Sequence, residues 1–385
     1  MGVRIGINAL FLVPGDVGGA EVYFLNTVRS LLRSNGDTEF VIFTTRDNDA
    51  YLQKELSEFQ GVKFIRLNFN ASCRPLRIIA EQTLLPFMVG KKKVDLLWSP
   101  GYTAPGICRC PQVVTIFDLQ YKSHPEDLSF MERITLDTLV RISCRICKAV
   151  ITISDFSKSE VVRWNMTSED RVWPVHLGVD PDFAVNTSGG KIINDICPSL
   201  PAGRPFILCV AHSYPHKKLH VLIDAFSKIH QDITHHLVLI GKPRRGEEDV
   251  QKSLEMMSHP EKVHRLHGVS FDGLKALYQA ADIFVLPSVY EGFGLPVLEA
   301  MMAGVPVITS RMASLPEVGG DHAVYVETET AEGFARSILD VSGWEEGKKE
   351  QWIVAARKWA ETFTWEKSAD KTMKVFQQVL KADAN

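Results

Sequence analysis

The sequence predicts an α/β protein with two domains, each a parallel sheet with helices on both faces. Strand-like and helix-like segments alternate along the chain, which is the pattern of such sheets. The 385 residues are too many for one ordinary hydrophobic core. A run rich in Gly, Pro, Ser and Asn interrupts the alternation near the middle of the chain. We therefore expect a first domain over 1–183, a linker over 184–204 and a second domain over 205–364.

The first domain is expected to begin directly with a strand. A helix at 19–33 follows from Val22, Leu25, Val28 and Leu32, which recur at helical spacing. The expected strands, in chain order, are 3–8, 39–44, 62–67, 95–99, 113–117, 149–153 and 171–175.

The second domain shows the same alternation without an internal sequence repeat. Its main helices are expected at 219–229 and 271–279, and two more helices close the chain at 347–362 and 367–381. The expected strands, in chain order, are 205–211, 236–240, 263–267, 282–287, 305–309 and 323–326.

Composition excludes several classes of protein. The formal net charge of −3 does not suggest a nucleic-acid-binding protein. No apolar run is long enough to span a bilayer, and the first strand is not preceded by a signal-peptide pattern. Seven cysteines, an odd number, favour a reducing compartment, so we expect a cytoplasmic protein.

The cysteine spacings could suggest a zinc site, but packing explains them better. Cys144 and Cys147 form a C-x-x-C within an expected helix at 136–148, and Cys108 and Cys110 form a C-x-C. No histidine pair at ligand spacing accompanies them. We therefore interpret these cysteines as packing residues.

The most informative segment runs from 283 to 308 and predicts a strand, a glycine-rich turn and a short helix. The apolar run 283–286 suits a strand covered on both faces. Gly292 and Gly294 allow a tight turn and a close approach to a ligand. Pro296 fits the start of the helix, and Gly304 fits the position just past its end.

This turn is suited to bind a phosphorylated ligand. Free N–H groups at the start of the helix favour a phosphate or diphosphate. Glu291 and Glu299 bracket the turn, and their carboxylates can accept hydrogen bonds from vicinal hydroxyls. A diphosphate flanked by two polyols describes a nucleotide sugar. On spacing alone, an ordinary strand–turn–helix with surface glutamates is an equally good interpretation.

The two glutamates resemble the E-x7-E signature of the retaining family 4 glycosyltransferases of the GT-B group. The similarity continues in order along the chain, at Gly18-Gly19, Phe117-Asp118-Leu119, 153–157, 178–180 and 363–365. The resemblance implies two Rossmann-like doubly wound domains facing a cleft. It further implies that the first domain lies on the acceptor side, that the second binds the donor, and that 365–385 cross back to the first domain.

The resemblance assigns roles around the glycine-rich turn. Glu299 would hold the ribose hydroxyls, and Glu291 would lie near the transferred sugar and take part in catalysis. The backbone amides of the turn, from Gly292 through Phe293 and Gly294 to Leu295, would meet the distal phosphate.

The segment after strand 205–211 resembles the family's basic loop. Lys217 would neutralise the leaving diphosphate, which makes it both a binding and a catalytic residue. Two adjacent cations, Lys217 and Lys218, oppose a helix dipole unless an anion lies there. His212 stands near a position where many relatives have arginine, and a histidine need not be charged at pH 7. A solvated start of a helix remains the alternative.

Other matches are looser. Gly18 and Gly19 resemble a flexible loop facing the diphosphate from the first domain, although a plain strand-to-helix turn is also possible. Asp118 is expected to orient the acceptor hydroxyl or to cap a helix. Phe117 precedes it, where many relatives have histidine, so a role for that histidine does not carry over.

Two loops of the second domain complete the expected donor site. Gly241 and Lys242 resemble a turn at the nucleotide, and Val269 lies in a loop whose backbone would meet the base. Structural turns are an equal alternative for both. The aspartate pairs at 47–49 and 180–182 are not expected near the nucleotide.

The resemblance implies transfer of a sugar, with retention, from a UDP-sugar or GDP-sugar to a carbohydrate or lipid-linked acceptor. Polysaccharide, lipopolysaccharide or glycolipid biosynthesis would use this reaction, which needs no metal or other cofactor. A nucleotide-sugar epimerase or a non-catalytic nucleotide-sugar-binding protein is the alternative. The basic and apolar segment 74–93 could rest on the anionic inner face of the cell membrane. A helix that merely covers the first sheet is slightly favoured there.

Overall fold

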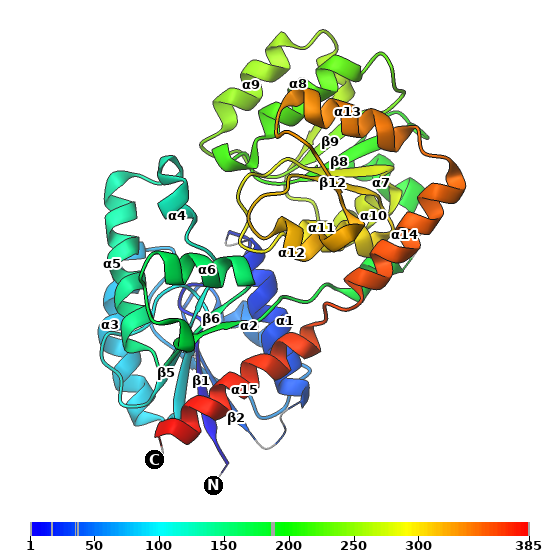
Figure 1. Cartoon of the computed structure of the whole chain (residues 1–385). Coiled ribbons are helices and arrows are strands. Elements are labelled where there is room, and N and C mark those ends of the chain that lie inside the picture. Colours follow the sequence, from blue (N-terminus) through cyan, green and yellow to red (C-terminus); the bar gives the residue numbers. More distant parts are fainter. Residues whose placement is uncertain (1, 17, 35, 37, 186–188, 384–385) are drawn as a thin grey trace. The chain divides into compact units, whose positions relative to one another are not determined.

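The computed structural model describes residues 2–16, 18–34, 36, 38–185 and 189–383 (Figure 1). The chain forms two compact units. Unit 1 consists of Met1–Leu119, Leu128–Gly178 and Thr364–Asn385, and unit 2 consists of Gln120–Asp127 and Val179–Phe363. The short segment Gln120–Asp127 therefore belongs with unit 2, although its neighbours on both sides belong to unit 1.

This division differs from the expected boundaries at 120–127, at 179–183 and in the stretch expected to be a linker. Residues 120–127 were expected within the first domain, but they group with unit 2. The stretch expected to be a linker, 184–204, contains the helix α7 (Gly189–Ile196) and the buried side chains of Cys197 and Leu200. Gly and Pro in that stretch flank a short helix, and the whole stretch belongs to unit 2, which resumes at Val179.

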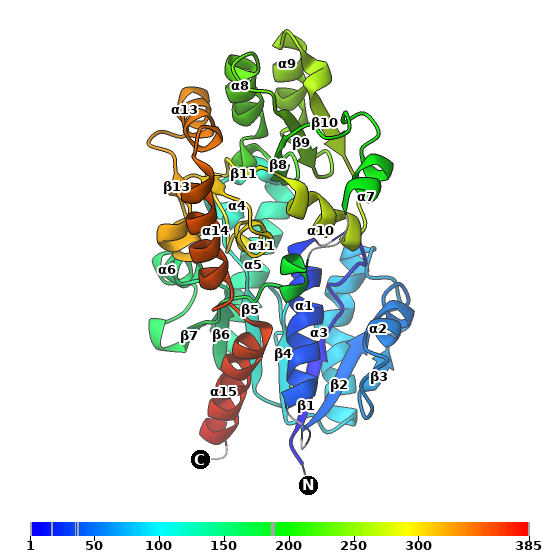
Figure 2. The ribbon, with the colours of Figure 1, turned by 90° about the vertical axis from the view of Figure 1, so that its right-hand side faces the viewer.

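Within the described residues, unit 1 contains a seven-stranded sheet in which every neighbouring pair is parallel. The strand order is β3-β2-β1-β4-β5-β6-β7, and Figure 2 shows the strands succeeding one another in this order. The strands are β1 (Arg4–Asn8), β2 (Glu39–Thr44), β3 (Lys63–Arg66), β4 (Leu96–Ser99), β5 (Gln112–Ile116), β6 (Ala149–Thr152) and β7 (Val172–Pro174).

Helices cover both faces of this sheet because successive side chains of each strand point to opposite faces. Trp98 of β4 packs against Tyr23 of α1 (Gly19–Ser34) and Phe376 of α15 (Trp365–Asp383). Its neighbour Leu97 packs on the other face, in a cluster with Leu85 of α3 (Arg74–Lys91). The remaining helical segments of unit 1 are α2 (Asp49–Glu55), α5 (Phe130–Ile146), α6 (Asp155–Arg163) and the 3₁₀ turn Glu169–Arg171.

Unit 2 contains a six-stranded parallel sheet among its described residues, in the order β10-β9-β8-β11-β12-β13. From β8 the chain adds β9 and β10 on one side, and it then adds β11, β12 and β13 on the other side of β8. A switch point between β8 and β11 results, and ligands of such sheets bind beyond the carboxyl ends of the strands there. The strands are β8 (Phe206–Val210), β9 (His236–Ile240), β10 (Val263–Leu266), β11 (Ile283–Leu286), β12 (Val307–Thr309) and β13 (Val324–Tyr325).

The core of unit 2 also lies on both faces of its sheet. Cys209 and Val285 belong to a buried cluster with Phe226 of α8 and Phe334 of α13. Phe284 faces the other way and lies 5.5 Å, between ring centroids, from Tyr278 of α10. The helices are α4 (Gln120–Ser123), α7, α8 (Leu219–Ile229), α9 (Glu247–Met256), α10 (Phe271–Ala280), α11 (Leu295–Ala303), α12 (Leu315–Gly319), α13 (Ala331–Ser342) and α14 (Glu346–Ala360). Short 3₁₀ turns lie at Pro125–Asp127, Pro181–Ala184, Pro215–Lys217, Pro260–Lys262 and Gly320–His322.

The predicted fold class is confirmed: the protein is α/β, with two parallel sheets of Rossmann-like type. Every expected strand is present within a few residues of its expected position. No helix of the described residues combines the length and the apolar character that a bilayer crossing requires.

Candidate functional site: the loops that follow β8 and β11

Two loops of unit 2 hold six of the predicted site residues, including Lys217 and Glu291. One loop follows β8 and ends in the 3₁₀ turn Pro215–Lys217, and the other follows β11 and leads into α11. The loops are neighbours because β8 pairs with β11, with Leu208 opposite Phe284. The strand order thus brings together two loops that are far apart in the sequence.

The structure joins Lys217 and Glu291. The ammonium nitrogen of Lys217 lies 2.7 Å from a carboxylate oxygen of Glu291, and the side chains are 18% and 11% exposed. The backbone amide of Val289 donates to the carbonyl of His216 at 2.9 Å, so the two loops are also held together through their backbones. An ion pair with so little exposure is screened less than a surface pair.

The glycine-rich turn has the backbone geometry that the sequence predicted. Gly294 has a φ of +103°, and a Cβ there would lie 2.9 Å from Leu315. The hydroxyl of Ser314 lies 2.9 Å from the carbonyl oxygen of Glu291 and 2.7 Å from that of Phe293. These contacts fix the turn from the side of α12. A side chain at Gly294 would require both a strained backbone and a movement of Leu315.

Helix α11 begins at Leu295, immediately after this turn, with Pro296 in its first turn. It ends at Ala303, and Gly304 follows with a φ of +82°. Gly294 is the capping residue, and within the described part of the chain this end of the helix has no side-chain cap. Pro296 has no N–H, and the amide of Val297 already donates to the carbonyl of Gly294 at 2.9 Å. The positive end of the helix dipole is therefore what suits this end of α11 to bind an anion.

Glu299 lies further along the same helix and is partly buried. One of its carboxylate oxygens accepts a hydrogen bond from the hydroxyl of Tyr278 at 2.8 Å. Burial raises the pKa of Glu299 to about 7, the Tyr278 hydrogen bond opposes that rise, and the nearby charge of Asp180 adds to it. Hydrogen-bond donors from a ligand would stabilise the ionised form of this carboxyl.

The loops after β9 and β10 lie beside the loop after β8. A Cβ on Gly241 would lie 2.1 Å from the carbonyl oxygen of Ala211, so only glycine allows the two backbones to approach this closely. The amide of Lys242 donates to Nδ1 of His212 at 3.0 Å. Nδ1 accepts in this contact, which places the ring proton on Nε2. Val269 precedes Ser270, whose hydroxyl caps α10.

Three predicted residues lie in unit 1. Gly18 has a φ of +55°, and Gly19 begins α1. Asp118 accepts a hydrogen bond from the hydroxyl of Tyr102 at 3.0 Å. Phe117, at the position where many relatives have histidine, packs edge-on against Tyr102 with ring centroids 5.2 Å apart. An aromatic ring there packs in the core of unit 1, so its role is structural.

Sequence reasoning missed a buried polar cluster next to Lys217. Nδ1 of His216 lies 2.8 Å from a carboxylate oxygen of Asp127, and the two residues are 2% and 3% exposed. The amide of Gln120 lies 2.6 Å from the same oxygen. The three residues are separated by up to 96 positions in the chain, and no local motif connects them. The only signal was that His216 adjoins a lysine already selected.

A second network supports the loop after β8 from its other side. Arg265 forms a two-pronged ion pair with Glu247, with N–O distances of 2.6 and 2.9 Å. The hydroxyl of Ser213 donates to the same carboxylate at 2.8 Å. The Arg265 hydrogen bonds lower the pKa of Glu247 to about 2. Glu247 therefore stays ionised near neutral pH and anchors Ser213 in the loop.

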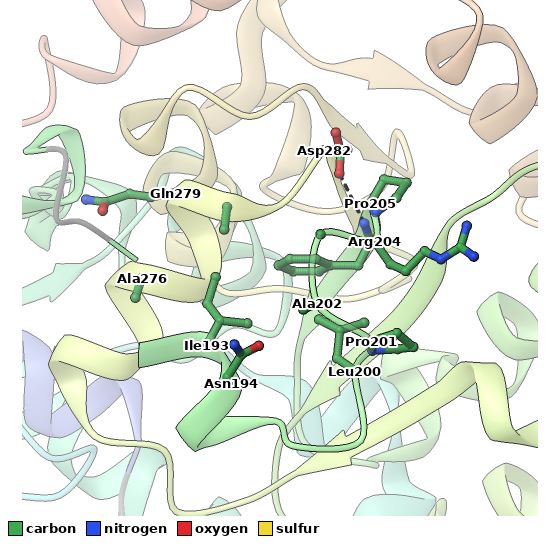
Figure 3. Close-up of a pocket in the computed structure, with 13 residues that line it drawn as sticks. Ile193, Asn194, Leu200, Pro201, Ala202, Arg204, Pro205, Ala276, Gln279 and Asp282 are labelled. Atoms are coloured by element: carbon green, nitrogen blue, oxygen red, sulfur yellow. Dashed lines mark hydrogen bonds between the residues drawn. The ribbon is translucent and has the colours of Figure 1, made fainter. Parts of the chain in front are cut away.

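A pocket of about 400 Å³ also lies in unit 2, at the amino ends of its strands (Figure 3). Its lining includes Pro205 and Phe206 at the start of β8, Asp282 just before β11, and Ala276 and Gln279 of α10. The amide of Phe206 donates to Asp282 at 3.1 Å. None of the predicted site residues lines this pocket. It lies at the edge of the sheet opposite to the loops that follow β8 and β11.

Comparison with known proteins identifies the class. Residues 17–183 match the sequence model described as Glycosyltransferase Family 4, and residues 197–359 match that of Glycosyl transferases group 1. The HepE structure of Anabaena in complex with UDP and glucose has the same fold, with a TM-score of 0.74 at 17% identity, over 98% of this chain and 100% of that one. The fold and the sequence matches define a glycosyltransferase.

The chain belongs to the group 1 glycosyltransferase family. An uncharacterized glycosyltransferase of Methanocaldococcus jannaschii is 31% identical to it over 398 residues, 94% of this chain and 95% of that protein. The O-antigen chain mannosyltransferase B of Escherichia coli is 29% identical over 260 residues. The chain spans 66% of the length of that mannosyltransferase, and the match covers 66% of this chain.

Proposed function

We propose that the protein transfers a hexose, with retained anomeric configuration, from a nucleotide-diphosphate sugar to a hydroxyl of a growing polysaccharide or glycolipid. The Lys217–Glu291 pair carries this proposal, since it joins the loop after β8 to the loop that leads into the start of α11. A cation, the positive end of a helix dipole and two carboxylates match the diphosphate and the two polyols of a nucleotide sugar.

Lys217 would act on the leaving group. Negative charge builds up on the diphosphate as the glycosidic bond breaks, and a fixed ammonium group stabilises that charge. Without a ligand this ammonium pairs with Glu291. The diphosphate would share or replace that contact, and Glu291 would then be available to the hydroxyls of the transferred sugar. Glu299 would accept hydrogen bonds from the ribose.

Retention requires attack from the face that the leaving group departs from, or a covalent intermediate. We assign the Glu291 carboxylate to the hydroxyls of the transferred sugar, which leaves it no part as a nucleophile. We therefore propose front-face attack, with the departing diphosphate accepting the proton of the acceptor hydroxyl.

The names of relatives guide the choice of substrates to test. One relative is named an O-antigen chain mannosyltransferase, and HepE was solved with UDP and glucose. Both GDP-mannose and UDP-glucose are therefore primary donors for a screen. We propose that the reaction belongs to the assembly of O-antigen or a related surface polysaccharide.

The test has two stages. A thermal-shift screen of UDP- and GDP-sugars should find a donor that raises the melting temperature, because only the folded state binds it. That donor is then incubated with candidate acceptors. NMR should show that the transferred sugar in the product has the same anomeric configuration as in the donor. Inversion would contradict the retaining mechanism. Conversion of the donor without acceptor would indicate an epimerase, and binding without turnover a non-catalytic protein.

We also propose that unit 1 contacts an anionic membrane through one face of α3 and α5, here named the α3–α5 face. The two helices lie side by side, and Arg74 at the start of α3 pairs with Glu132 of α5 at 2.7 Å. Large apolar side chains are exposed on both helices: Leu76, Ile79, Leu84 and Phe87 of α3, and Phe130, Met131, Ile134 and Ile142 of α5.

The exposed apolar side chains of α3 lie on the side of the helix that faces away from the sheet. Ile79 and Phe87 are 59% and 65% exposed and lie on one side of α3, while Leu85 and Val89 on its other side are fully buried in the sheet. The helix ends in the cluster Lys91, Lys92 and Lys93. The helix therefore covers the sheet and also presents a second apolar face, which supports the proposed membrane contact. Apolar side chains flanked by lysines match the interface of an anionic bilayer.

A further inference from the structure

The buried cluster at His216 lies next to both residues of the proposed donor site. His216 directly precedes Lys217 in the 3₁₀ turn Pro215–Lys217. Its carbonyl accepts the amide of Val289, which belongs to the loop that carries Glu291. A shift of His216 would therefore move the lysine and the glutamate together.

A short segment of the chain, Gln120–Asp127, holds this histidine in place. Asp127 contacts Nδ1 of His216 at 2.8 Å, and Gln120 donates to the same oxygen of Asp127 at 2.6 Å. His124 of the segment packs against the ring of His216 and edge-on against Tyr290, with centroid distances of 5.6 and 5.4 Å. Tyr290 directly precedes Glu291, so the segment contacts both loops.

The protonation of this cluster follows from its hydrogen bonds. An ionised carboxylate only accepts, so the short contact with Asp127 places a proton on Nδ1 of His216. The other oxygen of Asp127 is buried and has no hydrogen-bond partner among the described residues. A buried carboxylate in that state is costly unless a fixed donor compensates it. His216 and Gln120 are those donors.

We propose that Asp127 and His216 are positioning residues for Lys217 and Glu291. The segment Gln120–Asp127 holds both loops of the donor site through His216 and Tyr290, so that the ammonium group meets the diphosphate in one fixed place. This inference rests on the proposed function. Asp127 and His216 act through Lys217, and neither needs to touch the donor.

A double-mutant cycle with Lys217 tests the proposal. Asp127→Asn keeps the size of the side chain but lets it present an N–H to Nδ1, which removes the specific hold on the ring. We expect kcat to fall about tenfold to a hundredfold, as for a small misplacement of a group in an active site. Glu255→Gln, exposed on α9 of the same unit, should leave kcat within about twofold of wild type.

Calorimetry with UDP and GDP extends the cycle to binding. In the Lys217→Ala background, Asp127→Asn should cause no further loss of affinity for the nucleoside diphosphate, because residues that act through one another are not additive. Equal losses in both backgrounds would overturn the proposal. A wild-type protein that binds and transfers nothing would instead refute the proposed function, so the two failures are distinguishable.

A matched pair at His216 separates positioning from direct chemistry. His216→Asn places an amide N–H near the position of Nδ1 and should retain more activity than His216→Gln, whose amide reaches the position of Nε2. Circular dichroism and melting temperature check that both variants fold. If His216→Gln retains activity and His216→Asn does not, Nε2 takes part in the reaction. The proposed positioning role would then be wrong.

Discussion

At the scale of single residues, the proposed donor site contains two carboxylates with different surroundings. Glu299 accepts the hydroxyl of Tyr278 and is partly buried, while Glu291 is paired with Lys217. Two glutamates of one motif thus have different environments, and only the structure distinguishes them. The assignment of ribose to one and the transferred sugar to the other stays a prediction.

Removal of the Glu299 carboxylate tests its role in donor binding. Glu299→Ala should weaken nucleotide-sugar binding about tenfold to a hundredfold, because a charged hydrogen-bond acceptor contributes about 1.5–3 kcal/mol. Isothermal titration calorimetry with the donor found in the screen measures this change. Glu255→Ala, at an exposed position of α9, is the matched control. Unchanged affinity in Glu299→Ala would remove Glu299 from the site.

The raised pKa of Glu299 predicts a specific dependence of stability on pH. The pKa is about 7 in the folded protein and ordinary in the unfolded chain, so the folded state holds this proton more tightly. The free energy of unfolding therefore falls as the pH rises from about 4.5 to 7, and the loss is complete above that range. The shift corresponds to at most about 3 kcal/mol at 1.36 kcal/mol per pKa unit.

Glu299→Gln should remove this loss, since its amide oxygen can still accept the hydroxyl of Tyr278. We expect the variant to be more stable than wild type at pH 8 and about equal to it at pH 5. Urea unfolding at both pH values measures the difference. A difference that does not change with pH would show that Glu299 is not the group that titrates.

At the scale of elements, α3 illustrates how one helix can serve two surfaces. Its inward side contributes Ala80, Leu85 and Val89 to the core of unit 1, and its outward side exposes Ile79 and Phe87. A helix that only covers a sheet would carry polar residues on its outward side. The exposed apolar side chains therefore have a cost in water that a partner surface would remove.

Vesicle flotation tests the α3–α5 face. Wild-type protein should float with vesicles that contain anionic phospholipid and much less with neutral vesicles, and high salt should reduce the binding. The double variant Ile79→Ser, Phe87→Ser should lose most of the binding while keeping its melting temperature within a few degrees, since both side chains are exposed.

Val354→Ser is the control for flotation, because Val354 is 68% exposed on α14 in unit 2. It should float like wild type. If wild type floats equally with both kinds of vesicle, the lysine cluster has no role. If it floats with neither, the proposed membrane contact is wrong.

At the scale of the whole molecule, the last helix completes the first unit. Helix α15 belongs to unit 1, and its Phe376 packs with a centroid distance of 5.6 Å on Trp98 of β4. Gly178 lies where the chain leaves unit 1, and a Cβ there would be 2.2 Å from the backbone nitrogen of Trp365. The glycine of the 178–180 segment is thus explained by a close backbone approach.

Phe376→Ala should destabilise unit 1 more than unit 2. Phe376 is fully buried, and truncation of a buried phenylalanine costs about 3–5 kcal/mol. Limited proteolysis followed by mass spectrometry should show faster cleavage within 1–119 and 128–178 and little change within 179–363. Lys374→Ala, exposed on the same helix, should behave like wild type. Uniform acceleration across both units would show that they unfold as one.

The sequence by itself determined the fold class and the order of the strands along the chain. Val22, Leu25 and Val28 recur at helical spacing over a few positions, and Gly294 indicates a turn from its own position in the sequence. Signals of this kind depend only on neighbours in the chain, so they can be read without the fold. The choice of Lys217, Glu291 and Glu299 also came from local motifs.

The tertiary structure alone decided how these residues are paired and buried. The ion pair of Lys217 with Glu291 depends on β8 lying beside β11, and the contact of Asp127 with His216 joins positions 89 residues apart. The raised pKa of Glu299 depends on the residues that bury it in the fold. The exposure of Phe87 arises because no other described part of unit 1 covers that side of α3. Burial and charge pairing arise from neighbours in space, which the order of residues along the chain does not reveal.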